Sequence, residues 1–170
     1  MKKTRNKTPA GVILLAAVLL ITGIAWAEAT KIPVTGTMSS DPDIGSAESE
    51  WVDDDGVWHI RGMSSELTFL GDLEGEGTGV VNFNIDLSTG NGDEYGEWSD
   101  SELTWGELSG GFEGRYSMTY TDFVGIGHAA YQGTGDFDGM KFMTDFTIDL
   151  TIGPPYVVNF EGIILDPHGE

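Results

Sequence analysis

The side chains in this sequence that are best suited to hold a small molecule are aromatic. Trp105, Tyr116, Tyr120 and Phe142 occupy the apolar faces of successive strand-like segments. A tyrosine combines a large ring with a hydroxyl that can orient a ligand, and ligand pockets are mostly apolar with a few polar groups. The alternative is a plain core, because side chains usually fill the interior of a small barrel.

Tyr116 and Tyr120 are the strongest pair among these candidates. They lie four residues apart on one predicted strand, so both point to the same face, about 13 Å apart along it. Phe112 and Met118 share that face, which predicts that it turns inward. A buried hydroxyl needs a hydrogen-bond partner, which a cavity would supply through water or a ligand. The alternative is that both hydroxyls reach the rim of the barrel.

The three histidines, His59, His128 and His168, show no metal-ligand spacing such as HExxH, and the chain has no cysteine. The common zinc sites therefore cannot be built, and we predict neither a metal nor a cofactor. His128 begins a strand-like run and completes the set of candidate ligand-binding residues, whereas His59 is expected at the surface or at a cavity rim. No GxSxG motif is present, so serine hydrolysis lacks its usual signature. No catalytic residue is assigned.

Two aspartate-rich turns superficially resemble calcium loops: Asp53 to Gly56, and Asp136 to Gly139. A helix-flanked calcium loop that began at Asp53 would need glutamate at its twelfth position, where this chain has Ser64. Asp and Gly also favour tight turns, because both tolerate positive φ angles. Turn formation explains both sites without a bound cation.

Alternation of apolar and polar residues is the main secondary-structure signal, and it is clear between Gly125 and Leu150. In the second half of this stretch, apolar residues take even positions and polar residues odd ones, with an interruption at Met143 and Thr144. A period of two is typical of a strand with one buried and one solvated face. The residues in phase are Met140, Phe142, Phe146, Ile148 and Leu150 on one face, and Lys141, Asp145, Thr147 and Asp149 on the other.

Comparable segments along the chain predict an all-β fold of seven to nine strands. This estimate rests on ten strand-like segments: Ile32–Met38, Glu50–Val52, Val57–Met63, Glu66–Leu70, Val80–Leu87, Glu94–Trp105, Phe112–Thr121, His128–Gln132, Met140–Leu150 and Tyr156–Leu165. Many short strands joined by Gly-rich turns indicate a sandwich or a barrel. We predict a single antiparallel barrel of about eight strands, calycin-like in type, because a barrel leaves no free sheet edges.

Three local features refine this prediction. Ser39 to Ser49 is rich in small polar residues and is expected to be a loop. The parity of Trp98 conflicts with that of Leu103, which predicts a bulge or break near Asp100. Tyr156–Leu165 is apolar at both parities, which predicts burial on both faces or packing against another element.

The N-terminal segment has the three parts of a secretory signal peptide. Four basic residues lie within the first seven positions, an apolar run from Val12 to Ile24 follows, and Ala25-Trp26-Ala27 is a small-x-small cleavage signature. We expect a signal helix in residues 1–27, cleavage after Ala27, a barrel domain in residues 28–170, and a secreted or periplasmic protein. The alternative is an uncleaved membrane anchor, although the apolar run is short for a span.

After cleavage at Ala27 the chain would keep four basic residues against all 28 acidic ones, a formal charge of −24. Such a charge argues against nucleic acid or an anionic membrane as partner, because both would be repelled. It suits solubility outside the cell or weak association with divalent cations. Without cysteine the fold must be held by core packing alone.

Residues 127–141, GHAAYQGTGDFDGMK, resemble the strand-turn-strand signature of the allene oxide cyclase-like barrels, and dirigent proteins carry a similar pattern. The segments Gly56–Gly62 and Gly71–Gly75 resemble the opening of small secreted proteins of that group. The resemblance implies an eight-stranded antiparallel barrel with an apolar cavity, and a cyclase or a stereochemical guide among characterised relatives. No catalytic residue of those enzymes matches a position in this chain.

Two functional hypotheses follow. The first is a secreted barrel that binds a small hydrophobic molecule. An extension of this hypothesis is isomerase or cyclase activity on that molecule without a cofactor. The second is a non-catalytic acidic extracellular protein with a structural, assembly or cation-associating role.

Overall fold

The computed structural model describes residues 29–167 and residue 169, so the predicted signal helix and cleavage site lie outside the described residues. Nine strands make up most of this part of the chain, and no α-helix occurs in it. None of its helical segments is long and apolar enough to cross a membrane. The strands are β1 (Thr30–Asp43), β2 (Ser49–Val52), β3 (Val57–Gly71), β4 (Glu74–Asp86), β5 (Gly92–Trp105), β6 (Leu108–Thr121), β7 (Val124–Gly135), β8 (Lys141–Asp149) and β9 (Tyr156–Asp166); two 3-10 turns are η1 (Ile44–Ser46) and η2 (Leu150–Ile152).

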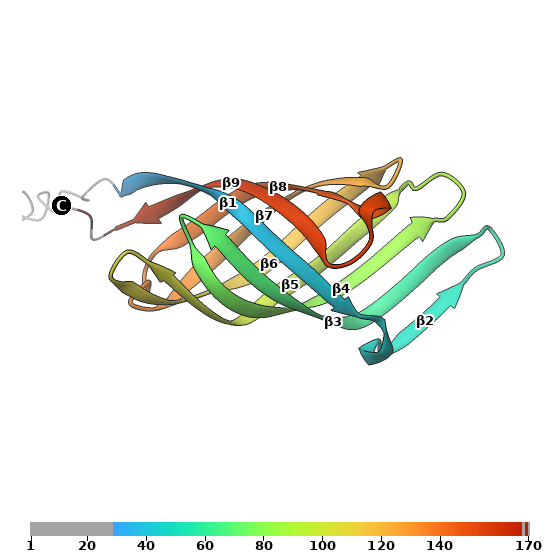
Figure 1. Cartoon of the computed structure of the whole chain (residues 1–170), viewed down its shortest axis with the longest axis horizontal. Helices are drawn as coiled ribbons and strands as arrows, with labels where there is room; N and C mark the ends of the chain where they lie inside the picture. The colour runs from blue at the N-terminus through green and yellow to red at the C-terminus, as the bar shows by residue number, and fades with distance from the viewer. Residues whose placement is uncertain (1–28, 168, 170) are drawn as a thin grey trace, which may run out of the picture.

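Eight of these strands close into an antiparallel barrel (Figure 1). From β3 to β9 each strand pairs with the next in the sequence. Strand β1 closes the ring, because Thr30–Ser40 pairs with β9 while Gly36–Asp43 pairs with β3. The ninth strand, β2, pairs with β3 beyond the point where β1 leaves it. The prediction of an all-β antiparallel barrel of about eight strands is confirmed.

The structure differs from the sequence predictions where pairing overrides local composition. Strand β1 runs through Asp43, although a loop was expected from Ser39, because its last residues hydrogen-bond along β3. Strand β3 is continuous where two strands were expected. A bulge joins its two halves: Gly62 has a φ of +66°, and the pairing with β4 shifts register between Ile60 and Met63.

Strand β9 is not buried on both faces, which corrects the expectation drawn from its composition. Val157 is 55% exposed and Ile163 is 38% exposed, whereas Val158 and Phe160 are buried. Val157 and Ile163 point outward, and no second layer packs on them in the described part of the chain.

The apolar–polar pattern of the sequence is interrupted at Met143 and Thr144, but the side chains of β8 still alternate regularly between the outside and the inside of the barrel. Met143 points outward and is 46% exposed, while Thr144 points inward and is 5% exposed. The Thr144 hydroxyl donates a hydrogen bond to the carbonyl oxygen of Glu161 at 3.0 Å. A hydroxyl that bonds to the backbone of the next strand removes the main cost of placing a polar residue in the core.

One end of the barrel is sealed by its own turns, and we call it the closed end. Phe137, from the Gly-rich turn between β7 and β8, and Leu73, from the turn between β3 and β4, both have 0% exposure. The Phe137 ring stacks on Phe112 with centroids 5.0 Å apart. The turn can approach this closely because Gly133 has no Cβ, which would overlap the carbonyl of Phe137.

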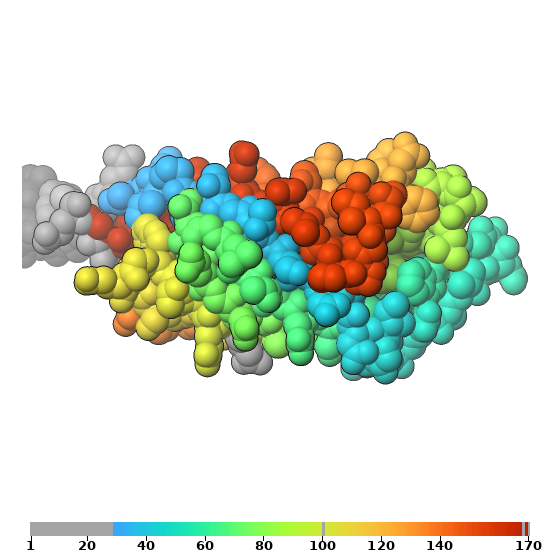
Figure 2. All heavy atoms as spheres, in the orientation of Figure 1, coloured from blue at the N-terminus to red at the C-terminus, as the bar shows by residue number. Residues whose placement is uncertain are grey.

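The opposite end carries η1, β2 and η2, and we call it the open end. Figure 2 shows that the segments around η1 and around residues 150–156 lie at this end of the molecule. Partly buried apolar residues, including Trp58, Leu150 and Tyr156, pack against the core here instead of a fully buried plug. The barrel is therefore asymmetric, with its most solid packing at the closed end.

We expect Phe137→Ala to lower the free energy of unfolding by about 3–5 kcal/mol, because it opens a cavity between buried rings. Urea denaturation followed by tryptophan fluorescence measures this change. Ile126→Ala is the control: Ile126 is 67% exposed on β7, so its truncation should change stability by no more than about 0.5 kcal/mol. Equal effects of the two substitutions would contradict the sealing role of Phe137.

Candidate functional site

A carboxyl group lies inside the barrel toward its open end. Glu94 of β5 points inward, on the same parity as the buried Trp98. Tyr116 donates a hydrogen bond to Glu94 Oε1 at 2.9 Å, and Tyr120 donates one to Oε2 at 2.6 Å. The residue is partly buried: its carboxyl is surrounded by side chains, yet some of its surface meets solvent. These three residues form the candidate site.

The register between β5 and β6 explains why two tyrosines from distant positions reach one carboxyl. Glu94 pairs with Met118, which lies midway between Tyr116 and Tyr120 on β6. The two tyrosine side chains therefore lean toward the centre from either side. Gly96 faces Tyr116, and a Cβ at that position would lie 2.7 Å from the tyrosine hydroxyl oxygen. Glycine is needed there for the ring to occupy its place.

Burial and hydrogen bonding act in opposite directions on this carboxyl. Burial raises the pKa of Glu94 above its ordinary value, and the hydrogen bonds from Tyr120 and Tyr116 partly offset that rise. Burial, followed by the negative charge of Glu94, raises the pKa values of both tyrosines. The tyrosines consequently remain protonated and act as hydrogen-bond donors, while Glu94 is the group whose protonation state can change.

Glu94 lies between two small cavities. One of about 30 Å³ extends toward Trp98, and another of about 80 Å³ extends toward the open end. Both are lined by Glu94, Val81 and Ile148. A carboxylate has about four acceptor sites, and the tyrosines use two of them. The remaining sites are available to a hydrogen-bond donor that enters from the open end.

The structure brings together two of the five candidate ligand-binding residues. Tyr116 and Tyr120 are 8% and 1% exposed, and their hydroxyl partner is Glu94 instead of the expected water, ligand or rim. Phe142 is buried deeper in the barrel, where its ring packs on Phe112 and Tyr131. Trp105 is partly buried at the closed end. These two residues belong to the core packing.

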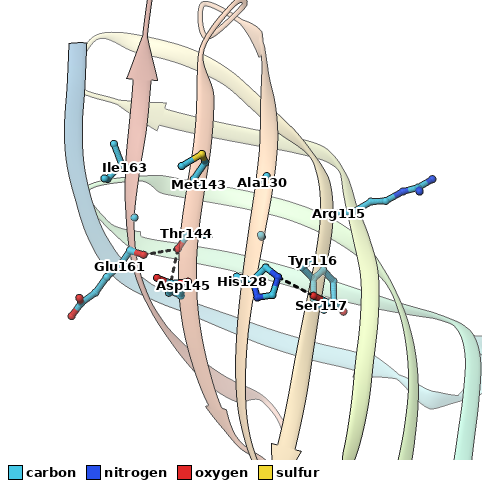
Figure 3. A pocket seen from close by; sticks show the side chains of 12 residues that line it. Arg115, Tyr116, Ser117, His128, Ala130, Met143, Thr144, Asp145, Glu161 and Ile163 are labelled. Carbon is cyan, nitrogen blue, oxygen red and sulfur yellow. Dashed lines mark hydrogen bonds between the residues drawn. The ribbon is translucent and has the colours of Figure 1, made fainter. Parts of the chain in front are cut away.

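His128 lies on the outside of the barrel and cannot share a site with the inward tyrosines. Its Nε2 is 3.3 Å from the Ser117 hydroxyl oxygen, within a depression of about 770 Å³ over strands β6 to β9 (Figure 3). Arg115 and Glu161 extend away from the barrel around it. This wide depression lacks the enclosing walls of typical ligand pockets.

Glu94 was missed in the sequence because an acidic residue is normally assigned to the solvated face of a strand, and the parity conflict between Trp98 and Leu103 left the inward face of this strand undecided. The structure confirms the bulge predicted near Asp100: pairing with β6 shifts register between Trp98 and Leu103. Tyr95 therefore points outward and is 46% exposed, while Glu94 points inward. One sign in the sequence could have shown that Glu94 faces inward: it has the same parity as Gly96 and Trp98.

A second polar cluster holds the β2 hairpin against the outer face of β3 and β4. His59 Nδ1 is 2.7 Å from Asn84 Oδ1, and its Nε2 is 2.9 Å from Asp53 Oδ2. Arg61 donates to the same Asn84 oxygen, and the Trp51 ring stacks on His59 with centroids 4.6 Å apart. Because acceptor oxygens face both ring nitrogens, the protonated imidazole is favoured. His59 is thus a surface residue that anchors a hairpin.

The aspartate-rich turns are held by hydrogen bonds of their own. Asp53 Oδ1 accepts bonds from the backbone N–H groups of Asp55 and Val57, and Asp136 Oδ2 accepts one from Ser109. Within the described residues, no group of three His, Asp or Glu side chains is arranged to hold a metal ion.

No protein-family model and no curated protein matches this chain. A solved structure does: a protein of unknown function of the DUF3224 family from Shewanella oneidensis MR-1 superposes with a TM-score of 0.56. The match covers 82% of this chain and 100% of that protein at 17% sequence identity. The likeness shows the fold alone.

We expect Tyr120→Phe to lower the free energy of unfolding by about 1.5–3 kcal/mol at a pH where Glu94 is ionised, because it removes a hydrogen bond to a charged group. It should also raise the pKa of Glu94 further, which carboxyl ¹³C NMR titration would measure. The control is Tyr131→Phe: the Tyr131 hydroxyl is buried without a hydrogen-bond partner, so its removal should be neutral or stabilising. A larger loss in the control would contradict this account.

A pH prediction follows from the His59 cluster. The hydrogen bonds to Asp53 and then Asn84 raise the pKa of His59, and the bond to His59 lowers that of Asp53. The stabilisation should be lost as pH rises through the raised His59 pKa, above 6.5, and as pH falls below 3.8 through the lowered Asp53 pKa. His59→Gln should therefore lower Tm most between these limits. A pH-independent loss would contradict the ion pair.

Proposed function

We propose that this chain is a small-molecule-binding barrel whose ligand enters at the open end and reaches Glu94. The observation that carries the proposal is the placement of a hydrogen-bonded but not saturated carboxyl between two interior cavities. A few polar groups within an apolar concave surface are the usual composition of a ligand site. The sealed closed end leaves one direction of approach.

The cavities limit the size of the ligand. Their volumes of about 30 and 80 Å³ lie well below the roughly 300–1,000 Å³ typical of pockets for drug-sized ligands. A large hydrophobic molecule would not fit within the barrel as it stands. We therefore propose that the ligand is a small molecule, or that one end of a longer molecule enters the barrel while the remainder stays at the rim formed by η1 and η2.

Isomerase or cyclase activity is an extension of this proposal. Burial raises the pKa of the Glu94 carboxyl, so its titration lies closer to neutral pH than that of an exposed glutamate, which favours a general acid or base. The resemblance of residues 127–141 to the allene oxide cyclase-like barrels also supports isomerase or cyclase activity, and the proposed export of the chain agrees with it. Glu94 is the residue to which we assign that proton transfer.

The second candidate function is a non-catalytic acidic extracellular protein. The charge of −24 after cleavage and the predominance of exposed carboxylates favour it. Such a protein would associate weakly with cations at its surface and would not respond to small apolar molecules.

Binding of cyclopentanol, a small neutral probe with one hydroxyl, tests the proposal. We expect saturable amide shifts in NMR spectra at the open end. Ile85→Phe should weaken binding about tenfold or more, equivalent to ~1.4 kcal/mol, because Ile85 lines the larger cavity. Ile126→Phe, on the exterior, is the matched control and should bind like the wild type. Equal binding by both variants would refute interior binding, as would the absence of saturable shifts in the wild type both with this alcohol and with a charged probe of the same shape.

A further inference from the structure

Within the part of the chain that the structure describes, the Glu94 carboxyl has no cationic side chain beside it. Neither cavity is lined by lysine, arginine or histidine. Of the basic residues in the described chain, Arg61 donates to the Phe83 carbonyl and to Asn84, and Arg115, Lys31 and Lys141 are exposed on the exterior. The charge on an ionised Glu94 is therefore stabilised by two tyrosine hydroxyls and is not balanced by an opposite charge.

A carboxylate in such a place has two ways to be neutralised. It can bind a proton, or a cation can enter and pair with it. Burial disfavours the unpaired charge and raises the pKa of Glu94. A ligand that supplies the cation removes that penalty, so ionised Glu94 selects among ligands by charge as well as by shape.

Aromatic side chains line the same cavity between Glu94 and solvent. Trp58, Phe83 and Tyr156 contribute to its wall, and the Trp58 and Phe83 rings meet edge to face with centroids 4.9 Å apart. The faces of such rings attract organic cations. A nearby carboxylate combined with aromatic walls is a chemistry that suits an ammonium group attached to an apolar body, and it disfavours anions.

We propose that the ligand of this barrel is a small organic ammonium ion, whose N–H groups donate to Glu94 and whose apolar part contacts the aromatic wall. This inference rests on the proposed function and narrows its ligand class. Where Glu94 is protonated before binding, the proton leaves the carboxyl for solvent as the ammonium group pairs with it. Binding should therefore strengthen as pH rises through the pKa of Glu94, and it involves no covalent step.

The experiment compares cyclopentylammonium chloride with cyclopentanol by isothermal titration calorimetry on residues 28–170, the form expected after cleavage at Ala27. We expect the wild type to bind the cation about tenfold or more tightly than the alcohol, because the charged donor meets a charged acceptor. Glu94→Gln should abolish this preference. The matched control is Glu113→Gln, which removes an exposed carboxylate on β6 with the same change in net charge, and it should retain the preference.

The outcomes separate the two proposals. Equal affinity for both probes in the wild type, or equal losses in the two glutamate variants, would overturn the ammonium assignment while leaving interior binding in place. Failure of both probes to bind would overturn both. Should Glu94→Gln fail to fold, the wild type alone decides: affinity for cyclopentylammonium must rise with pH through the Glu94 titration while affinity for cyclopentanol stays constant, and parallel profiles would refute the assignment.

Discussion

Strand β1 pairs with β9 along its first part and with β3 along its last part, and every other feature of the interior depends on this closure. The two ladders overlap from Gly36 to Ser40, and at Gly36 a Cβ would lie 2.7 Å from the Phe160 ring. Because the chain has no cysteine, backbone hydrogen bonds and the apolar contacts they align must hold the ring together. Closure also fixes which residues face inward, and therefore which polar group the interior must accommodate.

The volume of the aromatic side chains determines where space remains inside the barrel. At the closed end Phe112, Phe137 and Phe142 pack ring against ring, and the Trp98 and Tyr131 rings stack with centroids 4.3 Å apart. Toward the open end the rings of Tyr116 and Tyr120 lie over inward-facing glycines and extend to Glu94. The polar site is thus a consequence of packing: tyrosines fill the barrel with their rings and supply the hydroxyls that a buried carboxyl requires.

Alternation in the sequence was sufficient to predict the barrel, the inward direction of Tyr116 and Tyr120, and the bulge in β5. It failed where register, which depends on partners far along the chain, decides the outcome. The extension of β1 to Asp43 depends on pairing with β3, some 25 residues away. Glu94 was missed for a related reason: an acidic residue is normally assigned to the solvated face, and only the register of β5 against β6 reveals its partners.

The acidic exterior and the interior carboxyl act on a ligand over different distances. Exposed carboxylates repel anions and attract cations toward the barrel, but salt screens this attraction within about 8 Å at physiological ionic strength. The surface can therefore raise the rate at which a cation arrives, and it holds none firmly. Glu94 is enclosed by side chains, so its interaction with a charged ligand is screened much less. Selectivity for charge, where it exists in this molecule, must reside at Glu94 and its two tyrosines, and the exterior can only bring the ligand to them.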